Sequence, residues 1–151
     1  MKGRIWLNGM ETTQPDSLAK YLERGRRVWI NDSYWLVMPF KLKDPGVNLK
    51  YIGSSKTAAD LPADLLELTF NNVGVTPENK YQVWVDEKTR LITQWAFFKK
   101  FSDEKAEFTN PWADYQPYGR IKLSGSRGRE EGTMTPIAVF DSPPAGVFTT
   151  F

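Results

Sequence analysis

Four aspartates are the candidates for acid–base chemistry, because the chain contains no histidine and no cysteine. Those absences remove the imidazole base, the histidine metal ligand and the thiol nucleophile. A pair of carboxylates can still serve as acid and base, as it does in glycosidases. The aspartates that could form such a pair are Asp32, Asp44, Asp86 and Asp114. Each lies in a turn-like context that explains it without chemistry, so we expect no catalytic residue, no metal site and no cofactor.

Asp32 is the least ordinary of the four, because it lies between two apolar runs. We interpret its side chain as an acceptor for backbone donors at a point where a strand bends. The rival interpretation is an enzyme that acts on a glycan or a lipid through carboxylates such as Asp32. Mutation of Asp32 would abolish turnover in that case, whereas a protein without catalysis would lose only stability.

Basic residues near the C-terminus raise the question of an anionic partner. The segment 125–129, Gly-Ser-Arg-Gly-Arg, lacks the spacing of a phosphate-binding loop and leads into two glutamates rather than a helix. The residues that a nucleic-acid surface would use are Arg120, Lys122, Arg127 and Arg129, with Tyr115 and Tyr118 nearby. Since the net charge is only +2, we interpret these charges as the solvated face of a hairpin and expect no nucleic-acid partner.

Aromatic residues are the strongest signal in the composition, at 14% of the chain with six tryptophans. They bury large areas and favour pleated surfaces, which indicates a β-rich domain. The aromatics expected on strands with two partly apolar faces are Trp29, Trp35, Trp84, Trp95 and Phe98. Such side chains either form the core or line a cavity for an apolar ligand, and the sequence leaves both possibilities open.

The stretch from Val28 to Lys41 is predicted to be a central strand of an antiparallel sheet. Its second run, 34–40, is apolar at every position, as in strands that are covered on both faces. Pro39 would break a helix there. The best helix instead runs from Pro15 to Arg24, with Gly25 as its C-terminal stop.

Short strands separated by turn signals make up the rest of the chain. Further strands are predicted over 4–8, 47–53, 65–70, 81–86, 91–101, 119–123 and 135–140. Loops or turns are predicted at Asn8-Gly9 and over 54–62, 71–80, 87–90, 108–118 and 125–132. The pattern predicts a mainly β single domain over 1–151, built as an antiparallel sheet or open barrel with a covering helix.

Membrane insertion is not expected. No apolar run approaches the roughly 20 residues that cross a bilayer. The first seven residues also lack the apolar region of a signal peptide. We expect the chain as given to be soluble.

The segment 31–47, NDSYWLVMPFKLKDPGV, resembles a motif of a family of uncharacterised, usually secreted bacterial proteins. The blocks 70–77 and 119–123 resemble further motifs of that family, so the likeness covers most of the chain. The family is similar to the LolA/LolB superfamily of lipoprotein carriers. This similarity implies a LolA-like fold, an open antiparallel half-barrel closed over by helices, in a periplasmic or secreted protein. The residues that we assign to the structural motif are Asn31, Asp32, Tyr34 and Pro39.

The resemblance implies a carrier without catalysis, whose concave apolar face binds acyl chains or another lipophilic ligand. The side chains expected to line that face are Trp35, Trp84, Trp95 and Phe97. Because Trp84 and Trp95 lie on adjacent strands, their register decides whether they share a face. The alternative is a structural or protein-interaction domain whose aromatics are all core.

The chain departs from this family at its N-terminus, where members carry an export signal and additional strands. We therefore expect the half-barrel to lack its N-terminal strands and to leave an apolar sheet edge, which promotes self-association. A homodimer that pairs such edges is a hypothesis, and light scattering that shows a clean monomer would count against it.

Overall fold

The computed structural model describes residues 2–129 and 133–147. Its largest part is a five-stranded antiparallel sheet in the order β3-β4-β5-β6-β7. These strands are β3 (Val47–Lys56), β4 (Pro62–Phe70), β5 (Lys80–Asp86), β6 (Ile92–Phe98) and β7 (Phe108–Pro111). The two separate hairpins are β1 (Trp6–Leu7) with β2 (Met10–Glu11), and β8 (Ala113–Tyr118) with β9 (Ile121–Ser126). The mainly β, antiparallel class that the sequence predicts is confirmed.

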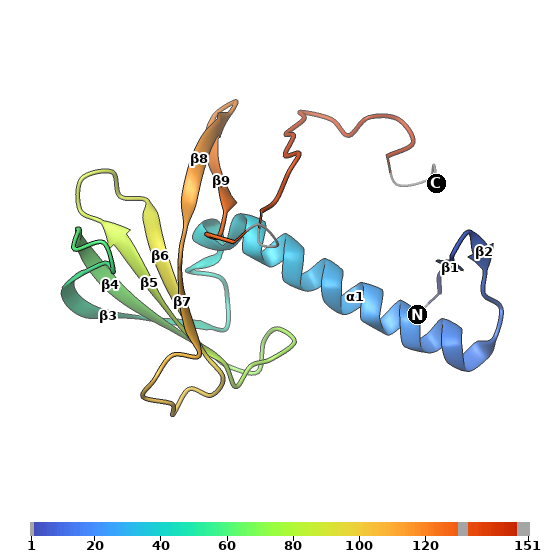
Figure 1. The fold of residues 1–151 in the computed structure, drawn as a ribbon, viewed down its shortest axis with the longest axis horizontal. Helices are drawn as coiled ribbons and strands as arrows, with labels where there is room; N and C mark the ends of the chain where they lie inside the picture. The colour runs from blue at the N-terminus through green and yellow to red at the C-terminus, as the bar shows by residue number, and fades with distance from the viewer. Residues whose placement is uncertain (1, 130–132, 148–151) are drawn as a thin grey trace.

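A helix of 23 residues, α1 (Pro15–Val37), stands where the central strand was expected and is followed by the 3-10 helix η1 (Met38–Lys41). The prediction of a strand over 28–41 is therefore wrong. In Figure 1, α1 projects away from the sheet, and only its C-terminal end lies beside the strands. A helix end that packs on several sides is apolar all round, and over so few residues it has the same pattern as a buried strand.

Neither Pro39 nor Gly25 has the effect on the helix that the sequence suggested. Pro39 lies in the first turn of η1, after α1 has ended, where a missing N–H costs little. The helix begins at Pro15 as predicted but continues past Gly25. A glycine inside an exposed helix costs only about 1 kcal/mol relative to alanine, which the packing of the helix end offsets.

The polar residues 31–33 are accommodated inside α1 rather than at a bend. Ser33 Oγ donates to the carbonyl of Trp29 at 2.7 Å. Asn31 Oδ1 accepts from Trp35 Nε1, one turn later, at 3.1 Å, and Asn31 Nδ2 donates to Asp32 Oδ1 at 3.1 Å. The bend expected at Asp32 is wrong, because these side chains find partners within one helical turn.

The β5–β6 hairpin is the part of the sheet that the sequence predicts best. It pairs Val83 with Trp95 and Tyr81 with Phe97, and opposed residues point to the same face of a sheet. We call this the inner face, because the end of α1 packs against it. The buried core on this side consists of Met38, Leu68, Val83, Ile92, Trp95 and Trp112.

The predicted strands over 47–53 and 65–70 are present but longer. β3 continues to Lys56 and β4 begins at Pro62, so the loop between them is shorter than the predicted 54–62. β3 is one edge of the sheet. It carries Lys50, Lys56 and a register shift between Tyr51 and Gly53, which are features that discourage pairing between chains. The homodimer through a sheet edge stays a prediction.

The loop predicted over 108–118 is wrong, since these residues form β7 and β8. Each of these strands contains a proline, a residue that argues against a strand when only the sequence is known. Proline is tolerated here, because Pro111 ends an edge strand and Pro117 lies in a two-stranded hairpin. Between them, Trp112 is only 1% exposed, and its backbone N–H donates to the carbonyl of Thr93 at 2.9 Å. Trp112 therefore joins the β8–β9 hairpin to the sheet.

The strand predicted over 135–140 is also wrong, because these residues have no strand conformation. The N–H of Met134 donates to the carbonyl of Gly125 at 2.8 Å. Pro136 has no N–H with which to continue a ladder from there. The charged turn predicted over 125–132 is part of β9 as far as Ser126, and 130–132 lie outside the described residues.

The N-terminal turn agrees with the sequence. Asn8 and Gly9 have φ of 52° and 80° and join β1 to β2. Positive φ at both central residues is what a two-residue hairpin requires and what the Asn-Gly dipeptide favours. Figure 1 shows this hairpin at the end of α1 that is remote from the sheet. It lies far from the inner face and does not form its edge.

Candidate functional site

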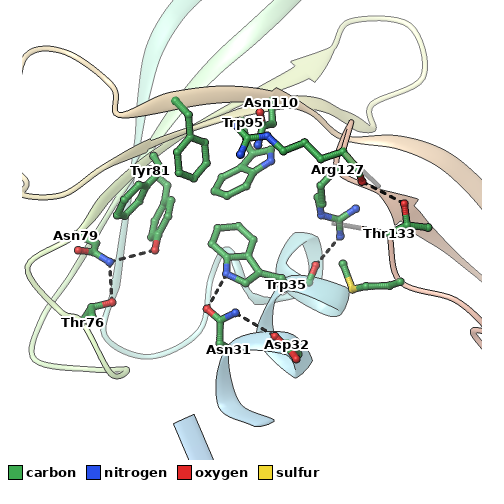
Figure 2. A pocket seen from close by; sticks show the side chains of 14 residues that line it. Asn31, Asp32, Trp35, Thr76, Asn79, Tyr81, Trp95, Asn110, Arg127 and Thr133 are labelled. Carbon is green, nitrogen blue, oxygen red and sulfur yellow. Dashed lines mark hydrogen bonds between the residues drawn. The ribbon is translucent and has the colours of Figure 1, made fainter. Parts of the chain in front are cut away.

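A cleft of about 610 Å³ lies between the end of α1 and the inner face of the sheet. We call it the aromatic cleft, because rings make up much of its wall. The rings that line it are Trp35, Tyr81, Trp95, Phe97 and Phe108. Figure 2 shows Trp35, which comes from α1, facing Tyr81 and Trp95, which come from the sheet. A volume of this size falls within the usual range of ligand pockets, about 300–1,000 Å³.

Trp35 is the centre of this ring cluster. Its ring centroid lies 4.3 Å from that of Trp95, 5.1 Å from that of Tyr81 and 6.0 Å from that of Trp112. The contact with Tyr81 is edge-to-face, an arrangement that adds to the gain from burial alone. Trp35 is thus the side chain that holds the end of α1 on the sheet.

A second cleft of about 460 Å³ lies on the other side of this contact. It is lined by apolar residues, among them Val47, Phe70 and Val75. Trp35 and Tyr81 line both clefts, so the pair forms part of the wall between them. The inner face therefore offers two adjoining spaces divided by rings.

Polar side chains surround the mouth of the aromatic cleft. Asn31 and Asp32, both exposed, line it from α1. On the opposite side Asn79 Nδ2 donates to Thr76 Oγ1 at 2.6 Å and to the Tyr81 hydroxyl at 3.3 Å. An apolar space with a polar rim is typical of a site that takes an apolar ligand and orients it.

Arg127 is the residue that sequence reasoning missed. The expectation that it belongs to a solvated basic face is wrong, since it is only 5% exposed. Its guanidinium lies 3.3 Å above the Trp112 ring and donates to the Trp35 carbonyl at 2.6 Å, to Ser124 Oγ at 2.8 Å and to the Ser126 carbonyl at 2.9 Å. Burial lowers the pKa of Arg127 to about 10, and the group is still charged at neutral pH.

The contact between Arg127 and Trp35 joins the end of α1 to the segment that follows β9. Trp35 belongs to the last turn of α1, where carbonyls lack partners in a regular helix. α1 has no basic residue of its own in that turn. Arg127 provides the positive charge that favours a helix C-terminus, and it comes from beyond β9.

Three of the four predicted lining residues meet in the aromatic cleft. Trp35, Trp95 and Phe97 all line it. Trp84 pairs with Gln94 and lies on the outer face, where its Nε1 donates to Ser55 Oγ at 3.3 Å. Its predicted place in the lining is wrong. Val83 pairs with Trp95 on the inner face, and neighbouring residues of a strand point to opposite faces.

The other aromatics and motif residues have different surroundings. Phe98 is buried on the outer face under the ammonium of Lys80, which lies 4.4 Å from its ring centroid. Trp29 is 68% exposed on α1 and lines neither cleft. Tyr34 lines the second cleft, and its hydroxyl is shielded from solvent without a hydrogen-bond partner in the described part of the chain.

The four aspartates have different partners. Asp86 accepts from the N–H and the hydroxyl of Thr89, each at 2.7 Å, which lowers its pKa and confirms its predicted role in a turn. Asp44 pairs with Lys41, and Asp114 accepts from Gln116 at 2.8 Å. The aromatic cleft is lined by Asp32 and the second cleft by Asp44, so among the described residues neither contains a pair of these carboxylates.

No protein-family model, curated protein or solved structure matches this chain significantly. Among the residues that the structure describes, no helix is both long enough and apolar enough to cross a membrane. In the same residues, no group of three or more acidic side chains is placed to hold a metal ion. The geometry of the two clefts is therefore the basis on which a function can be inferred.

Alkaline pH is expected to destabilise the fold through three partly buried tyrosines. Burial raises the pKa of Tyr34 and Tyr81, and it raises the pKa of Tyr115 to about 12. In the unfolded chain these phenols ionise near pH 10, so the unfolded state loses protons first. The stability that they contribute is complete below about pH 10 and is lost as the pH rises toward 12. The lowered pKa of Arg127 has the opposite effect on stability, which it raises as the pH rises. It comes from a single group, so we expect the three tyrosines to outweigh it.

Urea unfolding at pH values from 8 to about 11.5 tests this expectation. The free energy of unfolding should fall in the upper part of that range. Tyr34→Phe should give a shallower fall, because one of the responsible phenols is removed. A free energy that stays level or rises in wild type would contradict the assignment of these phenols.

Proposed function

We propose that this protein binds a lipophilic ligand, such as the acyl chain of a lipid or a lipoprotein, in the two clefts of the inner face and does not catalyse a reaction. The observation that carries the proposal is the aromatic cleft, which is open, about 610 Å³ in volume and walled by rings from both α1 and the sheet. The second cleft extends the apolar lining on the other side of Trp35.

Physical chemistry supports binding in such a place. Each methylene that leaves water contributes about 0.8 kcal/mol, so a chain laid along several rings accumulates affinity without directional contacts. Rigid indole and phenyl walls lose little conformational freedom on binding. A hydrolase that works through two carboxylates would need both of them in one cleft, and the described residues provide one in each.

The finer description of the fold belongs to the same proposal. The antiparallel sheet with the end of α1 packed at one face is consistent with a LolA-like half-barrel, an open sheet that holds acyl chains against covering helices. A periplasmic or secreted location would suit a carrier of that kind.

Titration with the neutral apolar dye phenylnaphthylamine tests the proposal. Its fluorescence should rise on binding to the wild type. Phe97→Ser, which places a hydroxyl in the aromatic cleft, should weaken binding about tenfold, as expected for about 1.4 kcal/mol of lost apolar contact. Phe101→Ser is the matched control, because Phe101 is 64% exposed and lines neither cleft.

The outcomes separate binding from a structural role. Weak binding by the Phe97 variant alone supports a ligand in the aromatic cleft. No binding by the folded wild type would favour an interaction domain whose aromatics are only core. Equal binding by both variants would show that the dye contacts another surface.

A further inference from the structure

Two residues that line the aromatic cleft each carry a hydrogen-bond donor without an acceptor in the described part of the chain. Trp95 Nε1 and Arg127 Nε are both shielded from solvent and have no hydrogen-bond partner in the described part of the chain. Their side chains belong to residues that are 7% and 5% exposed, and both residues line the aromatic cleft. An indole N–H and a guanidinium N–H can donate but cannot accept. A buried donor without an acceptor costs stability, so an acceptor from outside the chain would be favoured there.

The two side chains that carry these donors lie near each other. Trp112 is their common neighbour, with its ring centroid 6.4 Å from that of Trp95 and its ring 3.3 Å from the guanidinium carbon of Arg127. In Figure 2, both Trp95 and Arg127 lie beyond Trp35 as seen from Asn31 and Asp32.

The charge in this region favours an anion. Arg127 lacks an acidic partner among the described residues, since its hydrogen bonds go to carbonyls and a hydroxyl. Arg129 lines the same cleft, with its guanidinium 5.6 Å from the Phe108 ring centroid. Asp32 is the acidic residue among those that line the cleft, and it lies on the α1 side, where its carboxylate accepts from Asn31.

We propose that the ligand is an apolar chain that ends in a carboxylate, as a fatty acid does, with the carboxylate oxygens accepting from Trp95 Nε1 and Arg127 Nε and with Arg129 as a further cation nearby. This inference rests on the proposed function and adds the chemistry of the head group. The rings of the cleft contact the apolar chain of the ligand, and the two donors determine which end of the ligand lies beside Trp95 and Arg127.

Displacement of phenylnaphthylamine by three ligands of equal chain length tests the inference. Laurate carries accepting oxygens and a negative charge, methyl laurate accepts without charge, and laurylamine carries a positive charge and cannot accept. Wild type should bind laurate at least tenfold more tightly than laurylamine, with methyl laurate between them.

Two variants connect this preference to the cleft. Trp95→Phe keeps a ring and removes the N–H, so it should reduce the preference for laurate to about threefold or less. Arg129→Gln, at an exposed position, should reduce it by several fold without disturbing the core. Trp84→Phe makes the same substitution on the outer face and should leave the preference unchanged.

Each outcome bears on one of the two proposals. Equal affinity of wild type for laurate and laurylamine, or an unchanged preference in both Trp95→Phe and Arg129→Gln, would overturn the carboxylate and leave the lipophilic site standing. Failure of all three ligands to displace a bound dye would reject the lipophilic site itself. Loss of the preference in the cleft variants alone supports the carboxylate.

Discussion

Replacing Arg127 with methionine is expected to lower the free energy of unfolding by about 3 kcal/mol. The variant keeps the apolar stem but loses the guanidinium that stacks on Trp112 and donates to Trp35, Ser124 and Ser126. Carbonyls that are left buried without a donor cost about 1–3 kcal/mol each, which is more than the relief of burying one charge less. Urea unfolding at neutral pH measures the difference.

Arg120→Met is the matched control, because Arg120 lies on the same hairpin but is exposed. It should change the free energy of unfolding by less than about 0.5 kcal/mol. Hydrogen exchange should also become faster at the C-terminal end of α1 in the Arg127 variant, where the contact to Trp35 is lost. A loss of stability below about 1 kcal/mol, with unchanged exchange, would mean that Arg127 does not hold α1 to the hairpin.

Replacing Trp35 with alanine is expected to cost about 3 kcal/mol of stability and to weaken dye binding by more than tenfold. The indole is the common neighbour of Trp95, Tyr81 and Trp112, and it forms part of the wall between the two clefts. Its removal would merge the clefts and release the end of α1, so that rings no longer enclose a bound chain. Urea unfolding and phenylnaphthylamine titration of the same preparation measure both effects.

Trp29→Ala on the same helix distinguishes a specific loss from a general one. Trp29 is 68% exposed and lines neither cleft, so its removal should leave stability within about 0.5 kcal/mol and binding unchanged. If the Trp35 variant is folded and binds the dye as well as wild type does, the aromatic cleft is not the binding site.

Local patterns predict the strands of the sheet but not the helix whose C-terminal end packs against it. The alternation in β5 and β6 and the Asn8-Gly9 turn are signals carried by neighbouring residues, and these parts agree with the structure. The 34–40 run does not alternate, because its surroundings come from distant strands rather than from its own period. Its pattern fits a buried strand and a buried helix end equally well, and Pro39 favoured the wrong choice.

Residue type was sufficient to predict three of the rings in the cleft wall, but not the features that depend on register or on long-range contact. Trp35, Trp95 and Phe97 are large aromatics, and they do line one cleft. Trp84 lies on the outer face because of strand parity, which the sequence does not specify between β5 and β6. Arg127 is buried where it donates to the carbonyl of Trp35, 92 positions earlier in the chain. No local pattern in its own glycine-rich segment indicates that contact.

Native mass spectrometry of the protein as purified, followed by organic extraction of what is bound, tests the lipophilic site most directly. A stoichiometric species that adds the mass of a lipid, and that is lost in Trp35→Ala but kept in Trp29→Ala, is the predicted result. A carboxylate at one end of the extracted molecule would agree with the hydrogen-bond donors of Trp95 and Arg127 that lack an acceptor in the described part of the chain. A folded wild-type protein that is empty, and that takes up no added laurate or methyl laurate, would contradict the proposal and make the rings of the inner face core alone.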